Sequence, residues 1–255
     1  MVRKFKKSLG QNFLRDNVIL DKIFSSIDFT GCKRVIEIGP GDGALTKNLI
    51  HTGLPITAIE IDNNLANHLT KRYINQEGIK IINQDILKTD LNKFEGNRNI
   101  FVGNLPYNIS SQIILNLLES GISFNSATFL IQKELANRFA PKEGKSTKIS
   151  LQANFFANVE QLFDVHPEAF VPKPKVTSTL IKISPHNRNQ KRMKDYVKLK
   201  NLLSLCFANP RKQIRSSLRH LINSFEQLTF EVSLRPEELA LKDYFEILDI
   251  SEEQI

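Results

Sequence analysis

The sequence predicts an α/β domain built around a largely parallel sheet, followed by a smaller domain made only of helices. Two observations support this prediction. Between residues 34 and 139, short apolar segments alternate with segments whose apolar residues recur at helical spacing. After residue 186 the strand-like segments stop and only helical patterns continue. Alternation of strand and helix is typical of parallel sheets that helices cover on both faces.

Four strands are expected in the first half of the chain, at residues 34–39, 55–62, 79–85 and 99–104. Helices are expected at residues 44–53, 63–75 and 110–121. The first of these helices ends at Gly53, and the last begins at Ser110 and ends at Gly121, which are frequent residues at helix ends. Residues 127–139 read as a further strand that leads directly into a helix.

The pattern changes after residue 158. Residues 159–176 and 177–184 are expected to form two strands joined by a proline-containing loop, which suits an antiparallel addition at the edge of the sheet. A polar, basic linker is expected at 186–195. The helices expected after it cover residues 196–207, 212–225 and 236–250. We therefore expect a first domain at residues 1–185 and a helical domain at residues 186–255.

The composition is that of a soluble globular protein. The 255 residues are 41% hydrophobic and 24% charged, and no apolar run approaches the roughly 18 residues that suggest a membrane span. The basic N-terminus lacks the apolar core of a secretory signal. Cys32 and Cys206 are too few for a disulfide framework or a metal cluster. We expect a protein of the reducing cytoplasm that binds neither a membrane nor a metal.

The net charge of +8 favours a polyanionic partner. Residues 1–7 carry four basic side chains and no acid, and residues 186–224 carry ten basic side chains and one acid, Asp195. Four basic residues of the second block recur at helical spacing: Arg211, Lys212, Arg215 and Arg219. We expect this stripe to contact the phosphates of RNA, with an ordinary solvated helix face as the alternative.

A glycine-rich turn joins the first strand to the first helix, in Glu37-Ile38-Gly39-Pro40-Gly41-Asp42-Gly43. Glycines allow the backbone to approach a ligand closely, and the start of the helix offers free N–H groups. The turn fits a dinucleotide fingerprint loosely, but it does not by itself choose between NAD and another nucleoside cofactor.

Two carboxylates follow at the ends of the next two strands. Glu60 comes 21 residues after Gly39, where a carboxylate can accept both hydroxyls of a ribose. Asp85 ends the third strand, where it can accept from an adenine amine or cap a helix. Because the carboxyl ends of successive parallel strands meet at one crevice, the turn and both carboxylates predict one nucleotide pocket.

The fourth strand ends in Asn104-Leu105-Pro106-Tyr107 at the same rim. This tetrapeptide suits methyl transfer to an adenine N6 amine, whose lone pair is delocalised into the ring. The Asn104 side-chain carbonyl and the Leu105 backbone carbonyl can accept its two hydrogens, and Pro106 stiffens the backbone. Tyr107 can stack on a base that has been flipped out of its helix. A packed proline turn is the alternative.

Taken together, the motifs resemble those of the ribosomal RNA adenine N6,N6-dimethyltransferases, most closely the bacterial housekeeping type. The matching segments are GQNFL (10–14), EIGPGDGALT (37–46), IEID (59–62), NQD (83–85), NLPYNIS (104–110), EAFVPKPKV (168–176) and FANPRKQIRSSLRHL (207–221). The resemblance covers nearly the whole chain. It implies a Rossmann-like methyltransferase fold, whose mostly parallel seven-stranded sheet contains one antiparallel strand.

The resemblance implies S-adenosylmethionine as the methyl donor and S-adenosylhomocysteine as the product. The residues expected to line its site are Gln11, Asn12, Leu14, Gly39, Gly41, Glu60, Ile61, Asp85, Ile86 and Asn104. Phe170 is similar to a family residue that packs on the target base. The family methylates two adjacent adenosines, each twice, in a hairpin near the 3′ end of small-subunit rRNA. We therefore expect a monomer that acts on a 30S assembly intermediate.

Two positions depart from the family pattern. Ser146 and Thr147 stand where the family usually has a Tyr-Gly pair, and Pro210 stands where it usually has one of two adjacent arginines. The first departure affects local loop geometry, and the second removes one expected phosphate contact.

Two other functions remain open. One is an erythromycin-resistance type enzyme, which methylates an adenine of large-subunit rRNA on the same fold. The other is a non-catalytic nucleic-acid-binding or assembly factor. Leu105 and the arginine-containing helical domain favour the small-subunit enzyme, and an intact Glu60 and tetrapeptide argue against lost catalysis.

Overall fold

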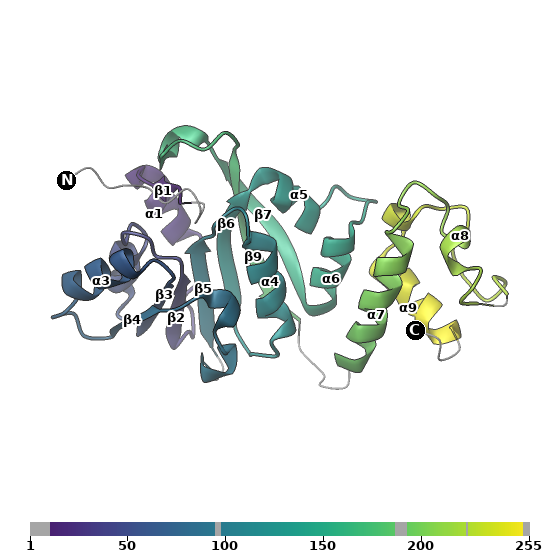
Figure 1. Ribbon diagram of the computed structural model, residues 1–255, viewed down its shortest axis with the longest axis horizontal. Helices are drawn as coiled ribbons and strands as arrows, with labels where there is room; N and C mark the ends of the chain where they lie inside the picture. Colours follow the sequence, from purple (N-terminus) through teal and green to yellow (C-terminus); the bar gives the residue numbers. More distant parts are fainter. Residues whose placement is uncertain (1–10, 95–97, 187–192, 223, 252–255) are drawn as a thin grey trace. The chain divides into compact units, whose positions relative to one another are not determined.

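The computed structural model describes residues 11–94, 98–186, 193–222 and 224–251 (Figure 1). By its internal contacts the chain divides into two compact units. The first comprises residues 1–136 and 160–185, and the second comprises residues 137–159 and 186–255. The predicted functional division at residue 185 stays a prediction. The basic arm at residues 1–7 lies outside the described residues, as does most of the predicted linker.

The first unit is built on a seven-stranded sheet with the strand order β4-β3-β2-β5-β6-β9-β7. Its strands are β2 (Arg34–Ile38), β3 (Ile56–Glu60), β4 (Ile79–Asn83), β5 (Asn99–Asn104), β6 (Ser126–Gln132), β7 (Ala157–Val165) and β9 (Ser178–Pro185). Neighbouring strands from β4 to β6 run parallel, and β9 runs antiparallel to β6. This topology confirms the predicted seven-stranded sheet with one antiparallel strand.

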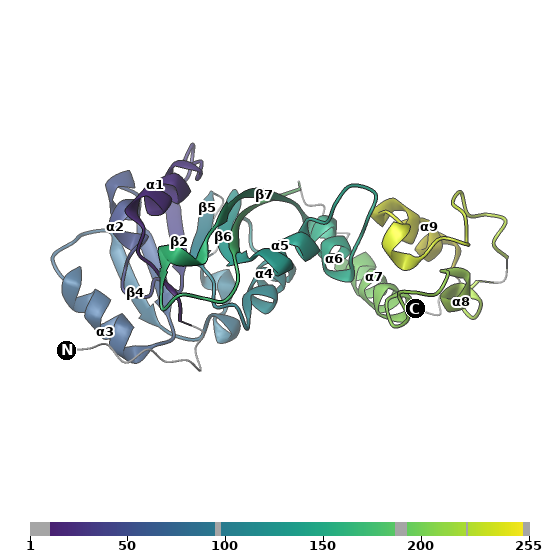
Figure 2. The same cartoon turned by 90° about the horizontal axis from the view of Figure 1, so that it is seen from above.

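Helices lie on both sides of this sheet (Figure 2), which explains why its central strands are mostly apolar. They are α1 (Asn17–Ser25), α2 (Thr46–Leu49) with the 3-10 turn Ile50–Thr52, α3 (Asn63–Arg72), α4 (Ser110–Glu119) and the start of α5 (Lys133–Phe139). Local sequence sets several of their ends. Asp16 caps α1 by accepting from the backbone N–H groups of Val18 and Ile19. Gly53, at a φ of 68°, ends the 3-10 turn that follows α2.

A short two-stranded ribbon stands apart from the main sheet. In it β1 (Phe13–Leu14) pairs antiparallel with β8 (Phe170–Val171). The backbone N–H of Arg15 continues the pairing by donating to the carbonyl of Ala169 at 2.7 Å. The ribbon therefore holds the N-terminal segment beside the proline-containing loop, although the two are far apart in the sequence.

The second unit is helical, with α6 (Lys148–Phe156), α7 (Met193–Cys206), α8 (Arg215–Leu218) and α9 (Leu241–Ile250). Its core includes the fully buried Tyr244 and Ile247, and the rings of Phe155 and Phe156 pack on Tyr196 with centroids 5.1 and 4.5 Å away. None of the described helices is long and apolar enough to cross a membrane.

The helix predicted over residues 212–225 is wrong in extent, because only Arg215–Leu218 is α-helical. The backbone N–H of Ile214 donates to the carbonyl of Leu234 at 2.7 Å, and that of Arg215 donates to Val232 at 3.2 Å. These bonds satisfy two N–H groups at the start of α8 that have no acceptor inside the helix. Beyond Leu218 the helical periodicity of the sequence does not continue as α-helix.

The departure at Ser146 and Thr147 has a structural explanation. Thr147 is the N-cap of α6, and its hydroxyl accepts from the backbone N–H of Ser150 at 3.0 Å. The Ser150 hydroxyl accepts in return from the backbone N–H of Thr147 at 2.9 Å, which completes a capping box. This chain therefore starts the helix with a hydroxyl cap at the place of the family's Tyr-Gly pair.

Candidate active site

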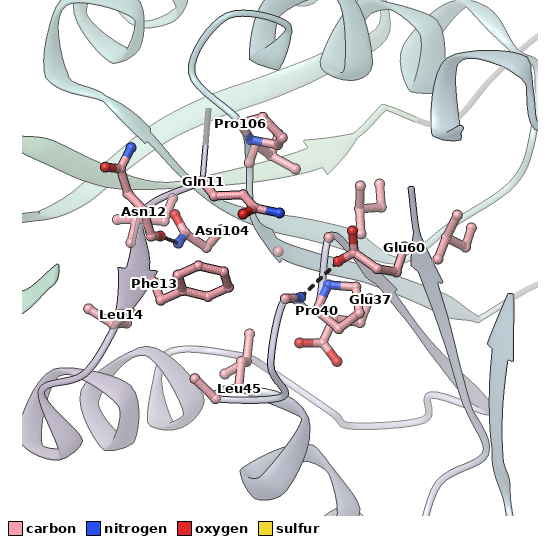
Figure 3. A pocket seen from close by; sticks show the side chains of 18 of the residues that line it. Gln11, Asn12, Phe13, Leu14, Glu37, Pro40, Leu45, Glu60, Asn104 and Pro106 are labelled. Atoms are coloured by element: carbon pink, nitrogen blue, oxygen red, sulfur yellow. Dashed lines mark hydrogen bonds between the residues drawn. The ribbon is translucent and has the colours of Figure 1, made fainter. Parts of the chain in front are cut away.

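A pocket opens at the carboxyl ends of β2, β3, β4 and β5 and is walled by the N-terminal segment Gln11–Leu14 (Figure 3). Its lining contains every residue that the sequence predicted for the cofactor site, namely Gln11, Asn12, Leu14, Gly39, Gly41, Glu60, Ile61, Asp85, Ile86 and Asn104. It also contains Leu105, Pro106 and Tyr107. The structure thus brings the two predicted sets of residues together in one pocket.

The glycine turn forms the floor beneath the N-terminal segment. Gly39 and Gly41 have φ values of 66° and 62°, a region that favours glycine. A Cβ atom on Gly41 would lie 3.0 Å from Cε1 of the Phe13 ring, and Figure 3 shows this ring pointing toward the turn. Glycine at position 41 therefore permits both the backbone conformation and the close approach of Phe13.

Glu60 ends β3 with its carboxylate held in place by two backbone groups. One oxygen, Oε2, accepts from the N–H of Gly41 at 3.0 Å, and Oε1 accepts from the N–H of Asp62 at 2.8 Å. Each oxygen keeps a further lone pair for a ligand. The side chain is 5% exposed, and this burial raises the pKa of the Glu60 carboxyl above its ordinary value.

Glu37 also lines the pocket, and it was not selected from the sequence as a site residue. Its carboxylate accepts from the Thr46 hydroxyl at 2.6 Å and is 1% exposed. Burial raises the pKa of Glu37 to about 7, while the Thr46 hydrogen bond opposes this shift. The signal available in the sequence was an acid inside the otherwise apolar end of the first strand, RVIEIG.

Asp85 follows β4, and the structure shows one of the two roles considered for it, that of a helix cap. Its Oδ1 accepts from the backbone N–H of Leu87 at 3.0 Å and so caps the short 3-10 helix Ile86–Lys88. The residue also lines the pocket. Capping uses one oxygen of the carboxylate, which has further lone pairs available to a ligand.

Asn104 ends β5, and its amide is oriented by the N-terminal segment. The side-chain Nδ2 donates to the backbone carbonyl of Asn12 at 2.8 Å. The same segment is attached at two further points, through a 3.1 Å hydrogen bond from Gln11 Nε2 to Asp62 and a 2.5 Å ion pair between Arg15 and Asp42. With its nitrogen engaged at Asn12, the Asn104 amide presents Oδ1 as an acceptor.

The next residues of the tetrapeptide are held by their own contacts. The carbonyl of Pro106 accepts from the Ser110 hydroxyl at 2.7 Å and from the backbone N–H of Ile109 at 3.2 Å. This leaves the Leu105 carbonyl as the candidate second acceptor. The Tyr107 hydroxyl lies 2.6 Å from the Ser178 hydroxyl, and burial raises the pKa of the Tyr107 phenol.

Phe170 lies apart from these residues. Its ring is 2% exposed and packs in a core cluster with Leu14, Leu20, Leu130 and Leu180, and it does not belong to the pocket lining. The ring therefore packs in the core, against side chains such as Leu14 and Leu180 that themselves line the pocket. Its predicted contact with the target base stays a prediction that requires β8 to move.

The four basic residues predicted to contact RNA lie in the second unit, and all are exposed: Arg211, Lys212, Arg215 and Arg219. Arg215 is the first residue of the single turn α8, Arg211 and Lys212 precede it and Arg219 follows it, so the four do not form a stripe along one continuous helix. The Arg215 guanidinium lies 5.9 Å from the centre of the Phe225 ring. Within the described residues there is no cluster of His, Cys, Asp and Glu that could hold a metal ion.

Sequence comparisons with known proteins all indicate the same family. A family model described as ribosomal RNA adenine dimethylase matches residues 2–254. The Ribosomal RNA small subunit methyltransferase A of Hahella chejuensis is 35% identical over 250 residues, covering 96% of this chain and 92% of the relative. The protein of the same name from Legionella pneumophila strain Corby is 35% identical over 246 residues, covering 95% and 96%.

Two solved structures share the fold. A dimethyladenosine transferase from Plasmodium falciparum superposes with a TM-score of 0.76 at 23% identity, covering 92% of this chain and 96% of the other. The 23S rRNA methyltransferase ErmE superposes with a TM-score of 0.74 at 22% identity, covering 94% and 99%. Likeness at this level of identity supports the fold alone.

Proposed function

The chain belongs to the ribosomal RNA adenine dimethylase family, and on that basis we propose that it dimethylates the N6 amines of two adjacent adenosines near the 3′ end of small-subunit rRNA. It is an enzyme that depends on S-adenosylmethionine. Its curated relatives carry the name of small-subunit methyltransferases, which supports the small subunit as the source of the substrate. The observation that carries the proposal is the oriented Asn104 amide in the same pocket as Glu60 and the glycine turn.

The pocket suits S-adenosylmethionine, which supplies a methyl group on an electrophilic sulfonium. Glu60 is fixed by two backbone N–H groups and accepts the ribose hydroxyls, as a carboxylate at the end of this strand does in nucleotide-binding folds. Asp85 accepts from the adenine amine. Ile61 is 46% exposed at the pocket and Ile86 lies in the same lining, so both offer apolar surface to the purine. The segment Gln11–Leu14 covers the other side.

The tetrapeptide holds the target amine. Asn104 Oδ1 and the Leu105 carbonyl accept the two N6 hydrogens, which favours a pyramidal nitrogen with an available lone pair. Alignment of that lone pair with the methyl group supplies much of the rate. No strong general base is needed, because the nitrogen becomes acidic only after methylation and then loses its proton to water. In the second round one hydrogen remains, so one of the two acceptors is enough.

Recognition of the RNA combines two kinds of contact. Phosphate contacts from the exposed basic residues around α8 position the rRNA without reading its sequence. Tyr107 stacks on the adenine, which must be flipped out of its helix to reach the pocket. In this proposal the protein acts as a monomer in the cytoplasm, and its substrate is an assembly intermediate of the 30S subunit.

The alternative of a large-subunit enzyme is less well supported. ErmE shares the fold at 22% identity, whereas relatives at 35% identity over nearly the whole chain carry the small-subunit name. A non-catalytic factor would not require an oriented Asn104 amide or a buried, backbone-held Glu60.

The test is transfer of labelled methyl from S-adenosylmethionine to small subunits that lack this modification, followed by digestion of the rRNA to nucleosides. We expect the label in N6,N6-dimethyladenosine, at two residues per subunit. Label that appears only when large-subunit RNA is supplied would select the alternative enzyme. No labelled adenosine on either subunit would overturn the proposal.

A further inference from the structure

We propose that Ser178 is a positioning residue for methyl transfer, acting through the hydroxyl of Tyr107. The inference rests on the proposed function, because it assigns Tyr107 the role of stacking on the target adenine. It concerns a residue that lies outside the pocket lining and outside every predicted site set.

The contact joins two distant parts of the chain. Tyr107 leaves the carboxyl end of β5, and Ser178 is the first residue of β9, 71 residues later. Their hydroxyl oxygens lie 2.6 Å apart. The hydroxyl of a tyrosine lies on the long axis of its ring, so a partner fixed at this point sets the direction in which the ring projects into the pocket.

Ser178 is well suited to be that fixed partner. It is 0% exposed, and its backbone pairs with Gln132 in the antiparallel ladder between β6 and β9. The preceding carbonyl, of Thr177, accepts from the backbone N–H of Lys133 at 3.0 Å. The serine hydroxyl therefore belongs to the rigid sheet, whereas Tyr107 lies in the turn that follows β5.

The tetrapeptide is thereby held at both ends by segments remote in sequence. The Asn12 carbonyl orients the amide of Asn104, and the Ser178 hydroxyl orients the ring of Tyr107. Asn104 and the Leu105 carbonyl fix the nitrogen of the target, while the ring of Tyr107 fixes the plane of its base. A small displacement of the nitrogen or of the base plane reduces the alignment between the amine and the methyl group that the transfer requires.

The experiment compares full-length wild-type protein with Ser178→Ala, Tyr107→Phe and the double variant. Ser126→Ala is the matched control, because Ser126 is also a buried serine and lies at the amino end of β6, away from the pocket. For each protein the measurements are kcat on unmodified small subunits, KM for S-adenosylmethionine, and the thermal midpoint.

We expect Ser178→Ala and Tyr107→Phe each to lower kcat by about threefold to tenfold, as for the loss of one neutral hydrogen bond. The KM for S-adenosylmethionine should stay within about twofold of the wild-type value if cofactor binding is untouched. The double variant should be no slower than the slower single variant, because both remove the same interaction. Ser126→Ala should keep the wild-type kcat.

Two results would overturn the inference. One is a wild-type kcat in Ser178→Ala, and the other is a double variant whose loss equals the product of the two single losses. Inactive wild-type protein would instead contradict the proposed function, so the two failures are distinguishable.

Discussion

At the scale of single residues, Asn104 combines a structural and a chemical role in one amide. Its nitrogen is engaged by the Asn12 carbonyl, and its oxygen is the proposed acceptor for the target amine. We expect Asn104→Ala to lower the rate of methyl transfer by about 100-fold or more, the size of loss seen when one transition-state hydrogen bond is removed. Affinity for S-adenosylmethionine should change little, as measured by calorimetry.

The control for that measurement is Asn125→Ala, since Asn125 is exposed and outside the pocket. It should match the wild type in both rate and affinity. Full activity in Asn104→Ala would remove this residue from the mechanism.

A second prediction at the residue scale concerns Glu37, whose carboxyl makes the stability of the folded protein depend on pH. Its pKa is raised from 4.5 to about 7 by burial, so the folded state binds a proton more tightly than the unfolded state does. The neutral form is therefore the stabilising one. Between pH 4.5 and 7 this group lowers the free energy of unfolding as pH rises, by on the order of 3 kcal/mol in total.

The variant Glu37→Gln mimics the protonated side chain at all pH values. We expect the free energy of unfolding of the variant minus that of the wild type to increase from pH 5 to pH 8. Urea titrations at several pH values measure this difference. A difference that is constant across this range would show that Glu37 keeps an ordinary pKa.

At the scale of elements, the start of α6 depends on the hydroxyl of Thr147. This hydroxyl accepts from the backbone N–H of Ser150 and donates to the carbonyl of Arg138 at 2.6 Å. We expect Thr147→Ala to lower the free energy of unfolding by about 1 kcal/mol, the usual loss for an N-cap. Thr147→Ser keeps the hydroxyl and should stay close to wild type. Wild-type stability of Thr147→Ala would show that the Thr147 hydroxyl contributes nothing to the fold.

The elements also show what sequence patterns reveal. The strands, the glycine turn and the helix ends of the first unit were predictable because apolar periodicity and Gly or Ser at the ends are local properties of the chain. The common location of Glu60, Asp85 and Asn104 followed from the rule that parallel strands end at one edge.

What the sequence did not reveal depends on contacts between remote segments. The two-residue strands β1 and β8 are too short to carry a pattern. The carbonyls of Val232 and Leu234 accept from backbone N–H groups at the start of α8, and Phe170 packs in a core cluster. The bond between Tyr107 and Ser178 has no local signal in either segment.

At the scale of the whole molecule, the net charge of +8 favours RNA phosphate contacts, and the number of such contacts should determine how RNA binding responds to salt. Reversing two of the exposed basic residues, with Arg215→Glu and Arg219→Glu, removes two proposed phosphate contacts. We expect weaker binding to small subunits and a plot of log affinity against log salt that is less steep by about 1 to 2.

The matched control carries the same change in charge at two exposed lysines of the first unit, with Lys71→Glu and Lys80→Glu. It should keep most of the wild-type salt slope. If the two double variants change the slope equally, the effect belongs to net charge and the residues around α8 are not a specific contact.

The pairing of β1 with β8 sets an order of events during synthesis of the protein. Phe13 pairs with Val171, which is made 158 residues later. At about 5 to 20 residues per second, the nascent chain spends roughly 8 to 30 seconds before the strand that pairs with β1 has been made. A chain cut short before β8 would carry both the glycine turn and the tetrapeptide, and would still lack the β1–β8 ribbon beside the pocket.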